Sequence, residues 1–176
     1  MGDSDAGAAY CVRMGLRISA CVAATATLMV CTAPLAAADA VTFTDPRGDA
    51  PSRYDLTRTT VTNADGGIVV AQRVRDLRGR RTQIFGFNFS GPGGNGIVHS
   101  VRRKDGTVRN RLIGSESGTE CEIRARWRLG RDSIRVRLAR ECIEGGVLRV
   151  STLIGAGNGS AGDPIDWTKT VAVRQG

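Results

Sequence analysis

Residue types that commonly carry catalysis are scarce in this chain of 176 residues. It contains one histidine, His99, and no C-x-x-C pair, which excludes the usual ligand sets of zinc sites. Neighbours on a strand point to opposite faces, so Ser100 cannot serve His99 as a nucleophile. A G-x-S-x-G motif is absent, and the glycine-rich run 91–96 lacks the Gly-Lys-Ser/Thr of a phosphate loop. We therefore expect no enzyme and assign no catalytic residue.

A small secreted hydrolase is the catalytic alternative. Glu116, Glu120 and Glu122 would supply the pair of carboxylates that glycosidases use. No insertion that would form a cleft accompanies them, so a non-catalytic protein remains the favoured interpretation.

Long hydrophobic runs are also rare, and the single one lies near the start. Two arginines precede an apolar run over residues 18–35, and a small-residue cleavage site ends at Ala40. We interpret residues 1–40 as a signal peptide with an upstream leader, and Met14 as an alternative start. A membrane-spanning helix over the same run is the competing interpretation. No later run approaches the roughly 18 apolar residues of a spanning helix, so we expect a secreted, extracellular protein without a transmembrane anchor.

The remaining chain, residues 41–176, is predicted to form one domain with a strongly basic charge. It holds 23 basic and 14 acidic residues, a net charge of +9, and all but two of the basic residues are arginine. A positive surface favours anionic partners such as cell-wall polymers, lipid head groups or nucleic acid.

Turn signals divide this domain into short segments rich in Val, Ile, Thr and Phe, and none of them shows helical periodicity. Regularly spaced short strands are typical of an antiparallel β-sandwich. The predicted fold class is therefore all-β, a sandwich of jelly-roll or immunoglobulin type. Its candidate strands are residues 54–62, 68–77, 82–90, 97–103, 107–113, 120–129, 133–142, 147–154 and 166–174.

The hairpin over residues 120–142 shows the alternation of a strand pair most clearly. Apolar residues share one parity, and a four-residue loop over 130–133 would place Trp127 opposite Val136. The same register places Cys121 opposite Cys142. Because an even cysteine pair in an exported domain indicates a disulfide, we predict a bond between them.

Arginines occupy the other parity of this hairpin. The predicted register places Arg128 opposite Arg135 and Arg126 opposite Arg137, and directly opposed like charges are unfavourable. Either this face is simply solvated or it binds anions. The candidate anion-binding residues are Arg124, Arg126, Arg128, Arg135 and Arg137.

Aspartates gather near the start of the domain. Asp45, Asp49 and Asp55 lie within eleven residues and are separated by proline and glycine. Ca²⁺ takes six to eight oxygen ligands from flexible loops, and Asp163 and Asp166 would add two more if the terminal strands are neighbours. Ordinary turn chemistry is the alternative, because Asp is a common turn residue.

The run D-P-x-G-D-A, followed by Tyr54-Asp55-Leu56 and a Thr/Val-rich strand, resembles the opening of secreted actinobacterial β-sandwich proteins. It is also similar to family-9-type carbohydrate-binding and DOMON-like domains. The resemblance implies a jelly-roll-like sandwich, structural calcium at the three aspartates, and binding of sugars or small ligands. Sugar-binding members use exposed aromatic platforms, and this chain departs from them because Trp127 is expected to point inward.

These observations favour an exported, non-catalytic binding or envelope-associated module with structural Ca²⁺. Its expected partner is an extracellular glycan or an anionic cell-envelope polymer. The first alternative is a polyanion-binding protein that uses the arginine-rich sheet face.

Overall fold

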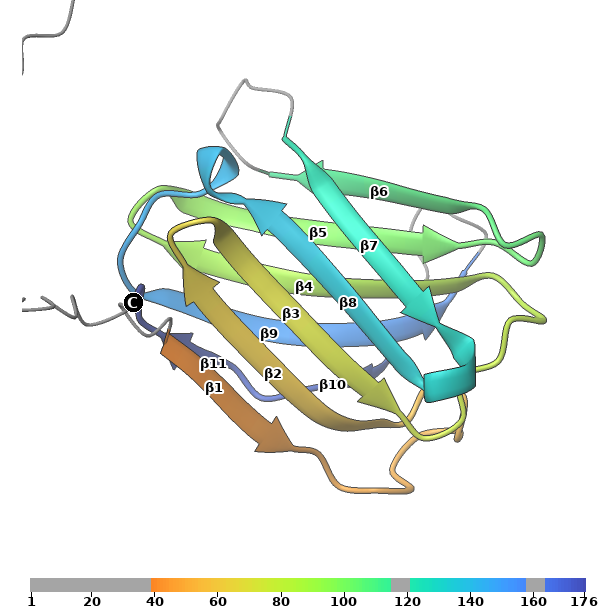
Figure 1. The fold of residues 1–176 in the computed structure, drawn as a ribbon. Helices are drawn as coiled ribbons and strands as arrows, with labels where there is room; N and C mark the ends of the chain where they lie inside the picture. Colours follow the sequence, from red (N-terminus) through yellow and green to blue (C-terminus); the bar gives the residue numbers. More distant parts are fainter. Residues whose placement is uncertain (1–38, 115–120, 158–163) are drawn as a thin grey trace, which may run out of the picture. The chain divides into compact units, whose positions relative to one another are not determined.

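A computed structural model of the chain describes residues 39–114, 121–157 and 164–176 (Figure 1). No helix in these ranges is long and apolar enough to cross a membrane. Short antiparallel strands make up most of the described chain. They are β1 (Asp39–Thr44), β2 (Leu56–Ala64), β3 (Gly67–Val74), β4 (Gln83–Gly91), β5 (Gly94–Arg102), β6 (Val108–Ile113), β7 (Ile123–Arg128), β8 (Ser133–Ala139), β9 (Leu148–Ala156), β10 (Pro164–Trp167) and β11 (Val171–Val173).

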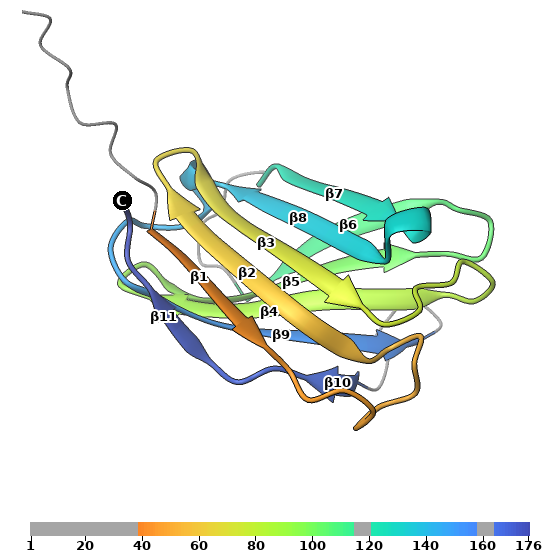
Figure 2. The same cartoon turned by 60° about the horizontal axis from the view of Figure 1, so that its bottom comes forward.

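The strands form two sheets that pack face to face, which confirms the predicted all-β sandwich. The first sheet has the order β1-β2-β3-β8-β7 and the second β10-β9-β4-β5-β6, with β11 also paired to β9. Figure 2 shows the two layers from the side on which β1 and β11 lie close together. Each sheet therefore has one inner face and one outer face that is free to carry a site.

Alternation of apolar and polar residues sends one face of each sheet into the core. Phe85 and Phe87 of β4 are fully buried and Phe89 nearly so, because alternate residues of a strand share one face. Burying one such side chain stabilises the fold by about 1.5–3 kcal/mol. Trp127 also points inward as predicted, and its indole Nε1–H donates to the Ser100 hydroxyl of the opposite sheet at 2.9 Å.

A buried polar network also joins the two sheets. Thr59 donates to the Gln72 amide oxygen at 2.9 Å, and the Gln72 amide nitrogen donates to the Thr152 hydroxyl of the other sheet. The Thr152 and Thr168 hydroxyls lie 2.9 Å apart. Because each buried group has a partner, the network favours one alignment of the sheets over its competitors.

Strand boundaries depart from the predictions at both ends of the domain. β1 was not predicted, and it begins at Asp39, so that it includes the last two residues of the predicted leader. The predicted strand 166–174 is two strands, β10 and β11, which pair with different parts of β9. Apart from Asp39 and Ala40, the predicted leader 1–40 lies outside the described residues.

The β7–β8 hairpin pairs in a register shifted by two residues from the predicted one. Trp127 lies opposite Ile134, not Val136. The loop has the predicted four residues but covers 129–132 instead of 130–133, because residues 129–131 form a single 3-10 turn and Asp132 ends this turn in the left-handed conformation with φ 49°. A shift of two residues leaves every side chain on its predicted face, so only the cross-strand partners change.

The predicted opposition of the two cysteines within the hairpin is wrong. Cys142 lies beyond the end of β8 in the 3-10 turn Arg140–Cys142, and Cys121 precedes β7. The two side chains are nevertheless neighbours, because Cys121 is a hydrogen-bond partner of the buried Cys142 thiol. Burial, with this hydrogen bond as a second cause, raises the pKa of Cys142 to about 12. No disulfide joins cysteines in the described part of the chain.

Candidate functional site

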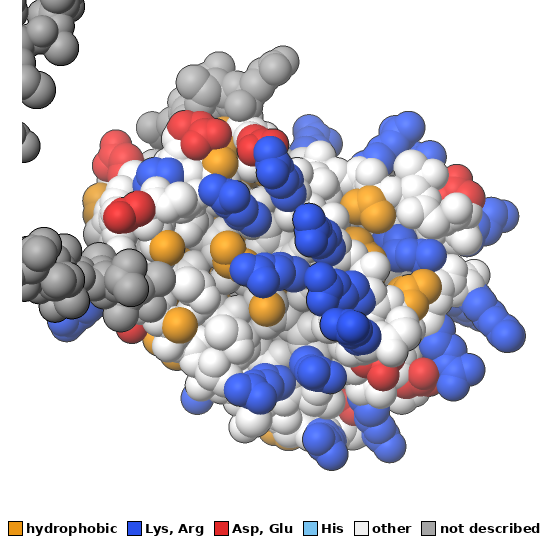
Figure 3. Space-filling view, in the orientation of Figure 1, with side chains coloured by type: hydrophobic (Ala, Val, Ile, Leu, Met, Phe, Trp, Pro, Cys, Tyr) orange, Lys and Arg blue, Asp and Glu red, His pale blue; other side chains and the backbone are white. Residues whose placement is uncertain are grey.

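The outer side of the first sheet carries a concentration of arginines, which we call the arginine face. Figure 3, which looks onto this sheet, shows arginine and lysine side chains gathered over it. All five predicted residues are exposed on this face, and two arginines of β2 and β3 join them. The face comprises Arg58, Arg73, Arg124, Arg126, Arg128, Arg135 and Arg137.

Strand register sets these residues in rows, because antiparallel partners project to the same side. Three rows cross β2, β3, β8 and β7 in that order. They are Arg58–Arg73–Ser133–Arg128, Thr60–Ala71–Arg135–Arg126 and Thr62–Val69–Arg137–Arg124.

Three pairs of arginines are directly opposed within these rows. The predicted pairings of Arg128 with Arg135 and of Arg126 with Arg137 are wrong because the register is shifted by two residues, and Arg128 faces Ser133 instead. Each opposed pair of like charges destabilises the sheet by about 0.2–1 kcal/mol. A bound anion would relieve this repulsion. The pairs are Arg58–Arg73, Arg126–Arg135 and Arg124–Arg137.

Carboxylates of the described chain neutralise little of this charge. Arg124 Nη2 lies 2.6 Å from Glu122 Oε1, and Arg137 Nη2 donates to the Gly66 carbonyl at 2.9 Å. The guanidinium groups of the other five arginines have no hydrogen-bond or ion-pair partner among the described residues. Their guanidinium groups are therefore available to ligands.

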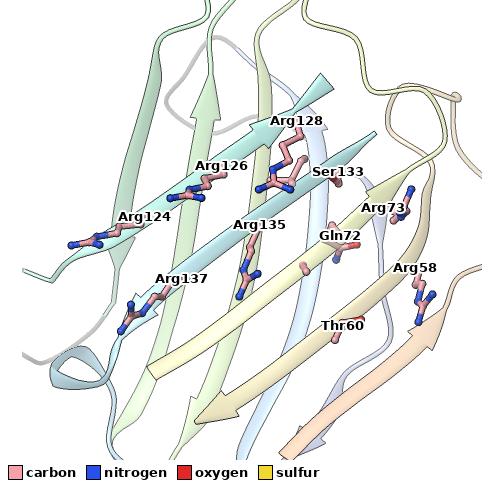
Figure 4. Close-up of a pocket in the computed structure, with 12 residues that line it drawn as sticks. Arg58, Thr60, Gln72, Arg73, Arg124, Arg126, Arg128, Ser133, Arg135 and Arg137 are labelled. Carbon is pink, nitrogen blue, oxygen red and sulfur yellow. The ribbon is translucent and has the colours of Figure 1, made fainter. Parts of the chain in front are cut away.

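The arginines surround a hollow of about 600 Å³ (Figure 4). Small side chains form the outward part of its floor: Ser133 lies between Arg73 and Arg128 in one row, and Thr60 and Ala71 precede Arg135 in the next. The Gln72 side chain turns away into the core. No aromatic residue of the described chain lines this hollow.

Sequence reasoning missed Arg58 and Arg73. Once a strand was assigned to each segment, the alternation of side chains indicated that both arginines point outward. The order β2-β3-β8-β7 brings them beside the hairpin arginines, and this order was not predicted. Strand propensity identifies strands but not their neighbours, so the extent of the face could not be predicted.

A second site, which we call the acidic cluster, comprises Asp45, Asp49, Asp55 and Asp166. Carboxylate oxygens of Asp45, Asp49 and Asp166 all lie within 4.8 Å of one another. Asp45 and Asp49 belong to the loop that follows β1, whereas Asp166 lies on β10. The structure thus brings together the two distant segments that the prediction combined. Asp163 lies outside the described residues.

Asp55 is the most buried member of the acidic cluster. Its side chain is fully buried, and its Oδ2 accepts the Gly48 backbone N–H at 2.8 Å. Arg75 Nη1 lies 3.6 Å from the same oxygen and is the one cation paired with the cluster in the described chain. Asp55 Oδ1 and Asp45 Oδ2 are buried without hydrogen-bond partners. A buried carboxylate oxygen without a partner is costly, and a bound cation would remove that cost.

The electrostatics of Asp45 and Asp166 reflect this crowding. Burial, followed by the charges of Asp166, Asp49 and Asp55, raises the pKa of Asp45 to about 6. Burial also raises the pKa of Asp166, although its Oδ2 accepts the Leu56 backbone N–H at 2.7 Å. The cluster therefore attracts either protons or a cation.

The residues considered for catalysis do not form a site in the described chain. Ser100 is buried in the core, while His99 points to the outer side of β5, so the two lie on opposite faces as predicted. Burial and the nearby Arg111 lower the pKa of His99. Glu122 is paired with Arg124, and Glu116 and Glu120 lie outside the described residues.

Comparison of the chain with models of known protein families and with curated proteins finds no match. The functional argument therefore depends on the geometry and charge of the sites themselves.

Proposed function

We propose that the domain is an extracellular, non-catalytic binding module whose arginine face binds anionic polymers. One observation carries the proposal: seven exposed arginines surround a single hollow, and five of them have no partner in the described chain. Guanidinium groups bind phosphate and carboxylate groups through two parallel hydrogen bonds. The extracellular location follows from the predicted signal peptide.

The spread of the arginines favours a polymer over a single small anion. Along β7, Arg124, Arg126 and Arg128 repeat every second residue, which corresponds to about 6.8 Å. Neighbouring strands add further positive charges at intervals of about 4.8 Å. Because no aromatic side chain lines the hollow, the face lacks the stacking platforms that read nucleic-acid bases. Binding should depend on the charges of the ligand backbone.

Retention on immobilised heparin tests this proposal. We expect the double variant Arg126→Gln/Arg135→Gln to bind heparin at least tenfold more weakly, because it removes two of the unpaired guanidinium groups. The matched control, Arg103→Gln/Arg174→Gln, removes the same charge elsewhere and should change the affinity less than twofold. Equal losses in both variants would show that net charge, and not the arginine face, binds the polymer.

We also propose that the acidic cluster holds a structural Ca²⁺ ion. The supporting observation is the pair of buried oxygens without partners, Asp45 Oδ2 and Asp55 Oδ1, in a group of four aspartates. Carboxylates and turn carbonyls are the ligands that Ca²⁺ prefers. An ion there would fasten the loop after β1 to β10, and its role would be structural.

Thermal unfolding of the metal-stripped protein tests the calcium proposal. Ca²⁺ should raise the melting temperature of the parent protein, and Asp49→Ala should abolish the rise. Asp105→Ala is a suitable control because Asp105 is exposed in the β5–β6 turn, and this variant should respond to Ca²⁺ like the parent. The same melting temperature with Ca²⁺ and with EDTA would contradict the proposal.

A disulfide between Cys121 and Cys142 is the third part of the proposal. The two side chains are hydrogen-bond partners, and an exported protein folds in an oxidising compartment. The bond would tie the start of β7 to the turn that follows β8.

A further inference from the structure

A second hollow, of about 640 Å³, lies on the outer side of the second sheet. We call it the Asn88 hollow. Strands β9, β4 and β5 supply most of its lining, so it lies on the opposite side of the sandwich from the arginine face. Its polar residues are mostly neutral, so we expect its ligand to differ from the anionic polymer proposed for the arginine face. They are Asn88, Ser90, Asn95, Ser151, Thr170 and the single charged residue, Arg149.

Asn88 occupies a central position in this hollow. The register places Ser151 on one side of it and Ile97 on the other. Its Nδ2 reaches the Ser151 hydroxyl only at 3.5 Å, and its Oδ1 is enclosed without a hydrogen-bond partner. An enclosed amide oxygen without a donor is unfavourable. A ligand hydroxyl would supply the missing donor.

Arg149 provides one positive charge beside these neutral groups. It lies on β9 opposite Ser90, is exposed, and forms no ion pair with any described residue. Its guanidinium group is suited to bind one carboxylate through two parallel hydrogen bonds. The hollow therefore fits a ligand with one anionic group, in contrast to the arginine face.

Apolar side chains complete the lining. Ile97 and Ile113 pair across β5 and β6 and are half-buried. Carbon-bound hydrogens of a sugar ring would pack against such surfaces, while its hydroxyls meet the polar side chains.

We propose that the Asn88 hollow binds an acidic saccharide unit. Arg149 holds the carboxylate, Asn88 and Ser151 bind ring hydroxyls, and Ile97 and Ile113 contact the apolar side of the ring. Neutral hydrogen-bonding groups, one unpaired arginine and an apolar wall together match a hydroxylated ring with one carboxylate. This site is separate from the arginine face and does not depend on the function proposed for it.

Calorimetric titration with glucuronate and with glucose tests the inference. We expect glucuronate to bind saturably with a Kd in the millimolar range and glucose to bind at least tenfold more weakly. Arg149→Gln should weaken glucuronate binding at least tenfold, and Ser151→Ala should weaken it severalfold. Arg103→Gln is the matched control, because it removes an exposed arginine that lines neither the Asn88 hollow nor the arginine face, and it should leave the Kd within twofold.

Other outcomes would overturn the inference. Glucuronate binding no tighter than glucose, no saturable binding by the parent, or equal losses in Arg149→Gln and Arg103→Gln would each do so. Melting temperatures of the variants establish that they are folded. Arg149→Gln should be retained on heparin as strongly as the parent. Glucuronate binding therefore tests the Asn88 hollow, and heparin retention tests the arginine face.

Discussion

The protonation state of Asp45 affects the unfolding free energy of the protein. Its pKa rises from 3.8 to about 6, so the folded protein binds this proton more tightly than the unfolded chain does. The resulting stabilisation is fully present below about pH 4 and is lost as the pH rises to about 6. We expect the metal-free protein to lose about 1–3 kcal/mol of unfolding free energy over this window through Asp45. Urea unfolding at several pH values measures the loss.

Comparison with Asp45→Asn isolates this contribution. The lowered pKa of His99 has the opposite effect on the pH dependence of the unfolding free energy. Its contribution to stability grows as the pH rises through its titration. The difference between parent and variant cancels His99 and leaves Asp45. A difference that stays constant between pH 4 and pH 6 would show that Asp45 titrates normally in the folded protein.

At the scale of elements, the alternation of apolar and polar residues predicted the sheet face of each side chain better than it predicted the residue paired with it across the hairpin. The parity of Trp127 and of the arginines on β7 followed from the period of a strand and is confirmed. The register depended on one residue, Asp132, in a left-handed conformation that residues other than glycine rarely adopt. Nothing in the alternation indicates such a residue, so the four-residue loop was predicted one residue too far along the chain. β1 was missed because it adjoins the predicted cleavage site.

Asp132 therefore fixes the β7–β8 hairpin, and its substitution should show this. Its carboxylate accepts the Leu77 backbone N–H at 2.9 Å while its backbone holds φ at 49°. Asp132→Ala loses the hydrogen bond and tolerates this conformation poorly, so we expect a loss of about 1–3 kcal/mol in unfolding free energy. Asp132→Asn keeps an acceptor and adopts the same conformation readily. Urea unfolding should place it within about 1 kcal/mol of the parent.

The proposed disulfide belongs to the same element. Closing the loop from Cys121 to Cys142 should stabilise the oxidised protein by about 3 kcal/mol over the reduced protein. Cys142→Ser should unfold at the same urea concentration with or without reductant, whereas the parent should unfold earlier when reduced. Mass analysis of the exported parent checks the bond directly, and two free thiols there would contradict the proposal.

At the scale of the whole molecule, both charged sites combine segments that are distant in the chain. The acidic cluster was predicted because its aspartates were conspicuous at both ends of the domain. The contribution of Arg58 and Arg73 to the arginine face was not, since it follows from the order of strands in the first sheet. Sequence alone therefore predicted most of the charged residues that gather in the two sites but only part of their extent.

The salt dependence of binding distinguishes a local face from the net charge of the molecule. For a flexible phosphate chain, log K falls with log salt by about 0.7 per neutralised phosphate. Five unpaired arginines predict a slope of about −3.5 for a single-stranded DNA oligonucleotide, used as a model phosphate chain and followed by fluorescence anisotropy. Arg126→Gln/Arg135→Gln leaves three of them and should reduce the slope to about −2. Arg103→Gln/Arg174→Gln has the same net charge and should keep the parental slope, because counterions are released where the phosphates are held. Equal slopes in the two double variants would mean that phosphates are held over the whole surface.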